Sequence, residues 1–323
     1  MKLSGIITNR FWQNDYFWQI VYEWEDIFQN ILNTNLSREK ALFKYRISKG
    51  IPFLYDLILF GKGHYFCYDM NVGNVHISRN SSHLIPCIID FWKSDSDILT
   101  FEKKYSNHKF VCISSREVFE YLKENGCRIN IEHLPLSISD KYRITPKTKY
   151  YKKYDIVLMG RQSPVLMKWF NSYIEKHPEI VYVYSARKGS DTFYHYSSNG
   201  EEIGNIDTRE KYLNLLSQGR VAFYSTPGTD GQKDAGGFSQ VTPRFLEIIA
   251  SGCHVMPRYI KNADTDYFML DRICPSLDSY NDFEQRMDYA LTHEVDMEKY
   301  SDYLENYYTS RCADKLKEIL KKY

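Results

Sequence analysis

This chain of 323 residues lacks several features that would place it in a specialised class. It has no stretch of about 20 apolar residues, the length that a membrane-spanning helix needs. Its first residues, MKLSGIITNRFWQNDYFW, lack the apolar segment and small-residue cleavage site of a signal peptide. The net charge of +1 provides no strongly basic surface of the kind that general nucleic-acid binders carry. We therefore expect a cytoplasmic protein that does not bind nucleic acid.

Closely spaced cysteine pairs are also missing. The seven cysteines are an odd number and include no CxxC motif, and several lie in apolar stretches that resemble strands. Buried free thiols in a reducing compartment explain this pattern better than disulfides or a zinc site. The cysteines are Cys67, Cys87, Cys112, Cys127, Cys253, Cys274 and Cys312.

Aromatic residues, in contrast, are abundant at 16% of the chain, and they crowd residues 11–28. Phe17, Val21, Trp24 and Phe28 follow helical spacing, which predicts one buried helix face. The aromatic residues off that face leave two alternatives open, stacking on a sugar and peripheral contact with the inner face of a membrane. Few basic residues accompany them, so the segment does not have the usual composition of a membrane-anchoring helix.

Alternation of apolar runs with longer amphipathic segments predicts an α/β protein with parallel sheets. In the first half, strands are expected at residues 3–7, 54–60, 86–91, 110–113 and 130–134, and helices at residues 15–32, 37–49 and 115–125. In the second half, strands are expected at residues 155–159, 180–185, 220–224 and 253–256, and helices at residues 164–177, 208–218, 280–291 and 297–321.

A polar segment at residues 137–153, rich in lysine and tyrosine, separates the two halves. We therefore expect an N-terminal Rossmann-like domain over residues 1–140, which would bind the acceptor, and a second Rossmann-like domain over residues 150–295. Residues 296–323 are expected to form a helix that packs back toward the first domain.

The most informative stretch is residues 236–259, GGFSQVTPRFLEIIASGCHVMPRY. A glycine-rich loop is followed by a helix that begins near Pro243, stops at Gly252 and leads into an apolar strand. Free amides and the helix dipole favour a diphosphate at such a helix start. Glu247 lies about one turn further along, where it is placed to accept hydrogen bonds from sugar hydroxyls. This arrangement predicts a nucleotide-sugar site.

The same stretch resembles the donor-binding segment of GT-B glycosyltransferases, in the branch with Arg-x-x-Glu before Ala-x-Gly. Here those residues are Arg244, Glu247, Ala250 and Gly252. The commoner retaining pattern has two glutamates. Glu247 matches the second of them, but this chain has Ser239 at the position of the first, which leaves the donor sugar and the stereochemical outcome open. The resemblance implies two Rossmann-like domains that face a central cleft, and transfer of a sugar from a nucleotide-sugar donor to a glycan or lipid-linked glycan, in surface polysaccharide assembly.

The resemblance also implies roles for residues outside this stretch. Arg161 follows the first strand of the second domain, where it and Lys168 would approach the donor phosphates and stabilise the leaving group. Lys233 lies in the glycine-rich loop that follows the strand at residues 220–224. The donor-binding residues are thus expected to be Lys168, Lys233, Gly236, Gly237, Ser239, Arg244 and Glu247. Arg161 is assigned to catalysis.

A catalytic base is expected in the first domain only if the reaction inverts the anomeric centre. Asp90, at the end of a predicted strand, is the best carboxylate, and His64 is the best histidine. For each of them a structural hydrogen-bonding role remains an equal alternative.

No metal or cofactor is expected, because protein cations and a helix dipole would meet the charge of the diphosphate. The competing sites are two Asp-x-Asp triplets of the kind that hold Mg or Mn, at residues 95–97 and 264–266. Two other functions also remain, a nucleotide-sugar epimerase on the same fold and a non-catalytic nucleotide-sugar-binding protein.

Overall fold

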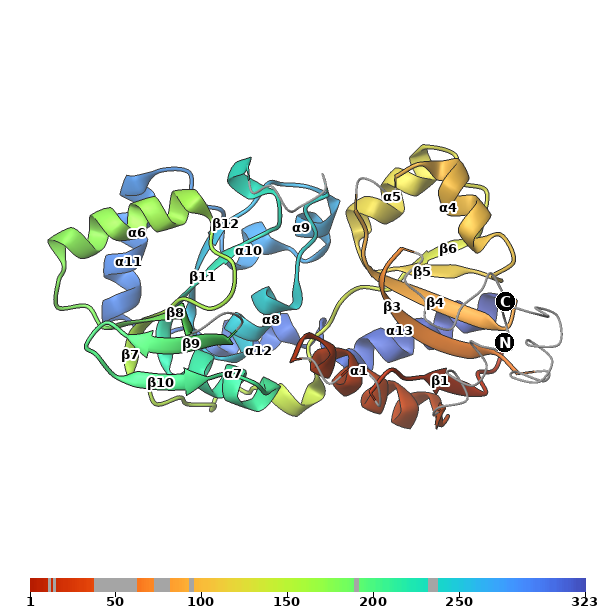
Figure 1. The fold of residues 1–323 in the computed structure, drawn as a ribbon, viewed down its shortest axis with the longest axis horizontal. Helices are drawn as coiled ribbons and strands as arrows, with labels where there is room; N and C mark the ends of the chain where they lie inside the picture. The colour runs from red at the N-terminus through yellow and green to blue at the C-terminus, as the bar shows by residue number, and fades with distance from the viewer. Residues whose placement is uncertain are drawn as a thin grey trace. The chain divides into compact units, whose positions relative to one another are not determined.

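The computed structural model describes residues 1–10, 13, 16–37, 63–72, 82–92, 96–188, 192–231 and 238–323. The chain divides into two compact units. Met1–Asp140, Phe238 and Tyr307–Tyr323 belong to the first unit, and Lys141–Ala235 and Ser239–Asn306 belong to the second. Each unit contains a six-stranded sheet with helices on both faces (Figure 1). Both units are α/β, as the sequence predicts.

The first unit contains a wholly parallel sheet in the order β2-β1-β3-β4-β5-β6. Its strands are β1 (Gly5–Ile7), β2 (Leu36–Ser37), β3 (Tyr65–Asn71), β4 (Leu84–Asp90), β5 (Val111–Ile113) and β6 (Ile131–His133). Its helices are α1 (Tyr16–Leu32), α4 (Ile98–Tyr105), α5 (Arg116–Glu124) and α13 (Thr309–Lys322), with a short 3₁₀ turn, η2, at Asp140–Tyr142.

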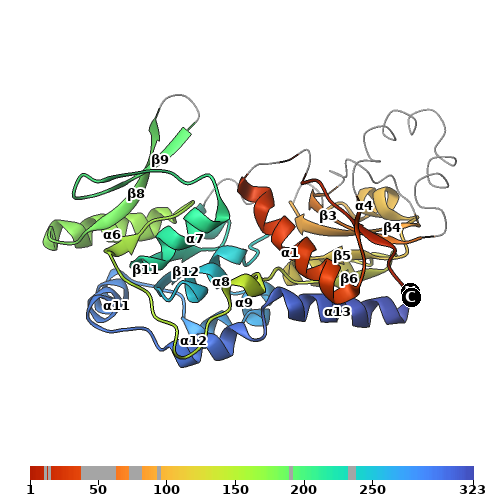
Figure 2. The same ribbon diagram turned by 90° about the horizontal axis from the view of Figure 1, so that it is seen from below.

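Helices α1 and α13 share one face of this sheet, and α1 lies along α13 (Figure 2). Phe28 is fully buried there, 5.6 Å from the ring of Phe66 and 5.9 Å from that of Tyr68. The indole of Trp24 donates a hydrogen bond to the carbonyl of Ser137 at 3.0 Å. The aromatic helix face predicted from its spacing is therefore a core face. Helices α4 and α5 pack on the opposite face of the sheet.

The second unit has a mixed sheet in the order β10-β9-β8-β7-β11-β12. Its strands are β7 (Tyr154–Val157), β8 (Tyr182–Lys188), β9 (Thr192–Ser197), β10 (Glu202–Asn205), β11 (Gly219–Ser225) and β12 (His254–Arg258). Strands β7, β8, β11 and β12 are parallel, and β9 and β10 run antiparallel to their neighbours.

The helices of this unit are α6 (Pro164–Lys176), α7 (Arg209–Ser217), α8 (Pro243–Ala250), α9 (Ala263–Tyr267), α10 (Leu270–Ile273), α11 (Tyr280–Thr292) and α12 (Met297–Leu304), with the 3₁₀ turn η3 at Thr229–Gly231. Helices α6 and α11 build the core on one face with Ile156, Val221 and Phe223. On the other face, Phe245 of α8 packs on Tyr224 of β11 and Tyr303 of α12.

The structure corrects the prediction of one helix over residues 297–321. Helix α12 ends at Leu304, and α13 begins at Thr309. Between them the chain is held by Ile138, whose amide donates to the carbonyl of Tyr307 at 3.0 Å and whose carbonyl accepts from the amide of Thr309 at 2.9 Å. This long-range backbone pairing replaces the helical hydrogen bonds. As a result, α12 belongs to the second unit and only α13 belongs to the first.

Two further predictions from the first half, the strand at residues 54–60 and most of the helix at residues 37–49, lie outside the described residues. In the described part of the chain, no helix is both long and apolar enough to cross a membrane.

The buried face of α1 generates a stability prediction. Phe28→Ala removes a fully buried ring, and we expect it to lower the free energy of unfolding by about 3–5 kcal/mol. Leu99→Ala is the matched control, since Leu99 is a large apolar residue of the same unit that is 69% exposed; it should change stability by less than about 0.5 kcal/mol. Urea denaturation measures both values, and equal losses would contradict the core assignment.

Candidate active site

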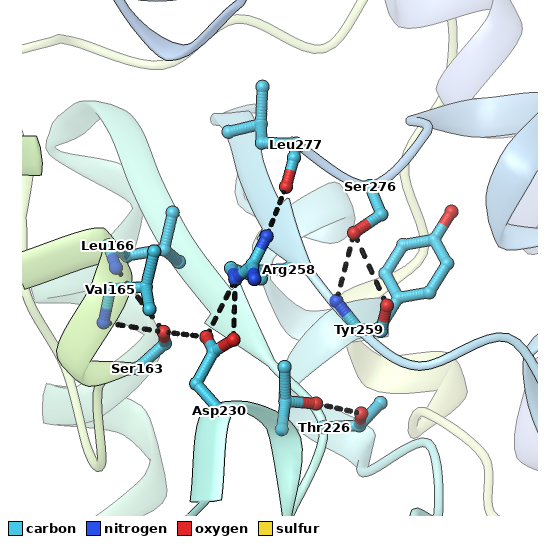
Figure 3. A network of polar contacts seen from close by, with 10 residues as sticks. Ser163, Val165, Leu166, Thr226, Asp230, Arg258, Tyr259, Ser276 and Leu277 are labelled. Carbon is cyan, nitrogen blue, oxygen red and sulfur yellow. Dashed lines mark hydrogen bonds and ion pairs between the residues drawn. The ribbon is translucent and has the colours of Figure 1, made fainter. Parts of the chain in front are cut away.

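The carboxyl ends of β7, β11 and β12 meet at one edge of the second sheet, where open α/β sheets bind their ligands. A polar network joins the loops that follow these strands (Figure 3). Arg258, at the end of β12, donates from Nε to both carboxylate oxygens of Asp230, at 2.8 and 2.7 Å. Ser163, which precedes α6, also donates to Asp230. One carboxylate therefore connects three loops from distant parts of the sequence.

Asp230 and its partners are fixed by further contacts. The backbone of Asp230 is left-handed, with φ of 61°, which is uncommon for a residue other than glycine. The hydroxyl of Ser163 also accepts from the amides of Val165 and Leu166 and so caps α6. Arg258 donates to the carbonyl of Leu277 at 2.7 Å and lies over the ring of Trp169. The network therefore orients the loops at this edge, and the sequence analysis did not identify any of its members.

Arg244, in the first turn of α8, contacts the loop that follows β7. Its Nη1 donates to the carbonyls of Met159 and Arg161, both at 2.9 Å. Gly160 between them has φ of 68°, and a Cβ atom there would lie 2.3 Å from that same nitrogen. Two segments that the sequence predicts for the donor site are thus brought together, and a side chain at position 160 would have to displace the end of Arg244. The guanidinium is partly occupied in holding this turn, which the sequence did not predict.

Ser239 is buried, and its hydroxyl lies 2.7 Å from the Thr226 hydroxyl and 2.9 Å from the carbonyl of Pro227. Its own carbonyl accepts from the Asn262 side chain at 2.9 Å. Ser239 therefore anchors the segment before α8 to the loop after β11.

Glu247 is predicted to accept hydrogen bonds from sugar hydroxyls, but its carboxylate is buried. It is 3% exposed, and Oε1 lies 2.5 Å from Nη2 of Arg209, the first residue of α7, which is also buried. A charge that is this deeply buried needs a partner of opposite charge. Arg209 is that partner, so the carboxylate of Glu247 is already paired within the protein.

Arg161, assigned to catalysis, and Lys168, assigned to donor binding, both have exposed side chains. Arg161 is exposed directly after the Gly160 turn, and Lys168 is exposed on the second turn of α6. Lys233, Gly236 and Gly237 lie outside the described residues.

In the first unit, Asp90 and His64 lie at opposite edges of the sheet. Asp90 is the last residue of β4, at the carboxyl edge, whereas His64 directly precedes β3, at the amino edge. Strand β3 has seven residues, which separates the two edges by roughly 20 Å. Burial lowers the pKa of His64, and its ring stacks on His83. His64 therefore lies at the amino edge, away from the carboxyl edge where Asp90 lies.

The same carboxyl edge holds a buried group that the sequence analysis missed. Glu25 of α1 is 1% exposed and accepts from the Thr8 hydroxyl, just beyond β1, at 2.5 Å. Arg10 lies 3.3 Å from Glu25 and 2.8 Å from Asp26. Burial raises the pKa of Glu25 to about 7, although Thr8 and Arg10 oppose the shift. Glu25 follows the helical spacing of Val21 and Phe28, so a glutamate on the apolar face of the helix was the available signal.

The two acidic triplets have local roles in the described residues. Asp97 caps α4 by accepting from the amide of Thr100 at 3.0 Å, and Asp266 lies 3.9 Å from Lys261. Asp264 is fully buried, and Asp95 lies outside the described residues. Within the described ranges, no three His, Cys, Asp or Glu side chains are grouped closely enough to hold a metal ion.

No family model matches this chain, and no curated protein sequence matches it. Solved structures do. One is AviGT4, a glycosyltransferase involved in avilamycin A biosynthesis, at a TM-score of 0.52 and 12% identity over 97% of this chain and 91% of that one. Another is the UDP-forming α,α-trehalose-phosphate synthase of Burkholderia xenovorans, in complex with glucose-6-phosphate, at a TM-score of 0.50 and 10% identity over 97% and 85%.

A Listeria monocytogenes structure described as a UDP-N-acetylglucosamine 2-epimerase matches at a TM-score of 0.47 and 10% identity, over 99% of this chain and 96% of that one. The first two structures are GT-B glycosyltransferases, and the likeness to them shows that this chain has the GT-B fold, as the residues around Arg244 and Glu247 predict.

The contact between Gly160 and Arg244 can be tested with a matched pair of glycines. Gly160→Ala adds both a positive-φ strain and a clash with the guanidinium, whereas Gly200→Ala adds only the strain, because no atom lies within 4 Å of its Cβ position. We expect the first variant to lose more stability than the second, by about 0.5–1.5 kcal/mol for each hydrogen bond that the displaced guanidinium loses. Equal changes in denaturant midpoint would mean that Arg244 does not constrain the turn.

The pair formed by Arg209 and Glu247 generates a second prediction. Glu247→Gln leaves the buried charge of Arg209 without its counterion and should cost about 3 kcal/mol of stability. Glu298→Gln makes the same chemical change at an exposed position of α12 and should be nearly neutral. Thermal unfolding compares the two, and a neutral Glu247→Gln would show that the ion pair is absent in solution.

Proposed function

We propose that this protein is a glycosyltransferase that transfers a sugar from a nucleotide-sugar donor to a hydroxyl of a glycan or lipid-linked glycan, in the assembly of a surface polysaccharide. The observation that carries the proposal is the junction of α8 with the Gly160 turn. This junction brings the start of a helix, the Gly160 turn and exposed Arg161 to the carboxyl edge of the parallel strands, in a GT-B fold.

In this proposal the diphosphate binds at the amino end of α8, where first-turn amides and the helix dipole favour negative charge. Arg161 follows the Gly160 turn with an exposed side chain, and in this proposal its guanidinium stabilises the charge that develops on the leaving diphosphate. Lys168, Lys233, Gly236 and Gly237 are proposed to complete this environment.

Arg244 and Glu247 take supporting roles in the proposal. Arg244 holds the Gly160 turn with one nitrogen, which positions that turn for the phosphates. A direct hydrogen bond from Glu247 to the donor would compete with Arg209, and we therefore assign Glu247 to positioning α7 and α8 beside the donor. Ser239 acts in the same way, through its contacts with the loop after β11.

If the reaction inverts the anomeric centre, we propose Asp90 as the base that accepts the proton of the attacking hydroxyl. We further propose that the reaction needs no metal and takes place in the cytoplasm, with or without peripheral contact with the inner face of the membrane.

The role of Arg161 is tested by binding. Arg161→Ala should weaken the affinity for nucleoside diphosphates by about 1–3 kcal/mol, the range for a hydrogen-bond partner of a charged group. Arg220→Ala removes the same charge at the amino end of β11, and it should leave the affinity unchanged. Calorimetry with UDP and GDP gives both values, and equal affinities for the two variants would exclude Arg161 from the donor site.

The reaction itself is tested by incubating the protein with a panel of nucleotide sugars and analysing the products, with and without EDTA. Transfer or slow hydrolysis of the sugar that survives EDTA supports the proposal. An epimerised nucleotide sugar would indicate the isomerase instead, and binding without turnover a non-catalytic protein. Loss of activity in EDTA, restored by Mn and abolished by Asp266→Ala, would overturn metal independence.

A further inference from the structure

A cavity lies in the second unit, lined by residues outside the proposed donor loops. It encloses about 360 Å³, within the range of small-molecule sites. The cavity lies beside the edge strand β12 and includes its first residue, His254, whereas the donor loops follow the other end of that strand. Helices α11 and α12 supply most of its remaining wall.

Two cationic side chains line this cavity without a carboxylate partner among the described residues. Arg286 of α11 donates from Nη1 to the carbonyl of Pro275 at 2.8 Å, which fixes its guanidinium. Lys299 of α12 is exposed, and only its backbone amide is engaged, by Asp296 at 2.9 Å. Of the carboxylates in the wall, Glu294 is paired with Arg220 at 3.2 Å and Asp296 caps α12. The cavity therefore offers two cations that are free to meet an anion.

Arg286, Lys299 and the buried Cys274 all line this cavity. Burial raises the pKa of the Cys274 thiol to about 12; the positive charges of Arg286 and Lys299 oppose that shift, and the negative charge of Asp271 adds to it. A thiol with so high a pKa is not a nucleophile near neutral pH, so the cavity is suited to binding rather than to cysteine chemistry.

The cavity lining also includes an aromatic ring, that of Tyr289, one turn beyond Arg286 on α11. The ring of Tyr289 stacks on His293 at 4.1 Å and 9°, and its edge contacts His254. The imidazole of His254 is held by the carbonyl of His293 at 2.8 Å. Tyr289 is nevertheless 55% exposed, so the stack leaves ring surface uncovered. A flat ring in the ligand would cover that surface at little conformational cost.

We propose that this cavity is a second ligand site, which binds a small phosphate monoester attached to a flat ring. Arg286 and Lys299 bind the phosphate, since a fixed guanidinium and a mobile ammonium together suit its oxygens. Tyr289 stacks on the ring. The site is independent of the proposed glycosyl transfer, because its lining shares no residue with the donor loops.

Phenyl phosphate is the probe, because it carries the two recognised groups and no ribose or diphosphate. Calorimetry should show binding to the intact protein that is at least tenfold tighter than that of inorganic phosphate. Arg286→Gln and Lys299→Gln should each weaken it about tenfold, the effect of losing one charge-assisted contact. Lys147→Gln, which removes an exposed cation elsewhere in the same unit, should leave it unchanged.

Two further measurements make the outcome decisive. The variants should bind UDP as the unchanged protein does, which separates this site from the donor site. In the unchanged protein, phenyl phosphate should shift the NMR signals of the His254 and Tyr289 rings, a test that does not depend on any variant folding. Absence of those shifts, or an equal loss of affinity in Lys147→Gln, would overturn the proposal.

Discussion

The arrangement of the loops at the carboxyl edge of the second unit depends on the position of Asp230. Its carboxylate accepts from Arg258 and Ser163, which lie at the ends of loops from opposite sides of β11. Parallel strands bring their loops to one edge, but the loops acquire a fixed geometry only where side chains connect them. Asp230 provides that connection from a left-handed backbone position, and the strain of that position is offset by a charged network that is largely removed from water. The Gly160 turn and the start of α8 lie among these loops.

Each unit also contains a buried glutamate that is paired with an arginine, Glu247 with Arg209 and Glu25 with Arg10. Removing two charges from water costs about as much as their attraction returns, so such pairs are weak evidence of stability. They do fix orientation, since a displaced partner would leave a buried charge unmatched. Helix α8 is thereby tied to α7, and helix α1 to the end of β1. In both units this orientation is set close to the carboxyl edge.

Local signals predicted much of the fold. Helix α5 begins after Ser115, whose hydroxyl accepts from the amide of Val118, and it is followed by Gly126 with φ of 76°. The hairpin of β9 and β10 was not predicted although its turn contains Asn199 and Gly200, a strong hairpin signal, because the alternation of apolar and amphipathic segments indicated only parallel strands. It also joined α12 and α13, because both have helical periodicity and the pairing with Ile138 that separates them comes from a residue far away in sequence.

The sequence by itself determined the α/β class, the division into two halves and the loop, helix and strand around Arg244, because caps, glycines and apolar periodicity are local properties. Only the tertiary structure decided which side chains meet. It separated His64 from Asp90 by the length of a strand, buried Glu247 against Arg209 and turned Arg244 onto the Gly160 turn. Those outcomes depend on the direction in which each strand runs and on contacts between residues far apart in the chain, and no pattern within a short segment contains that information.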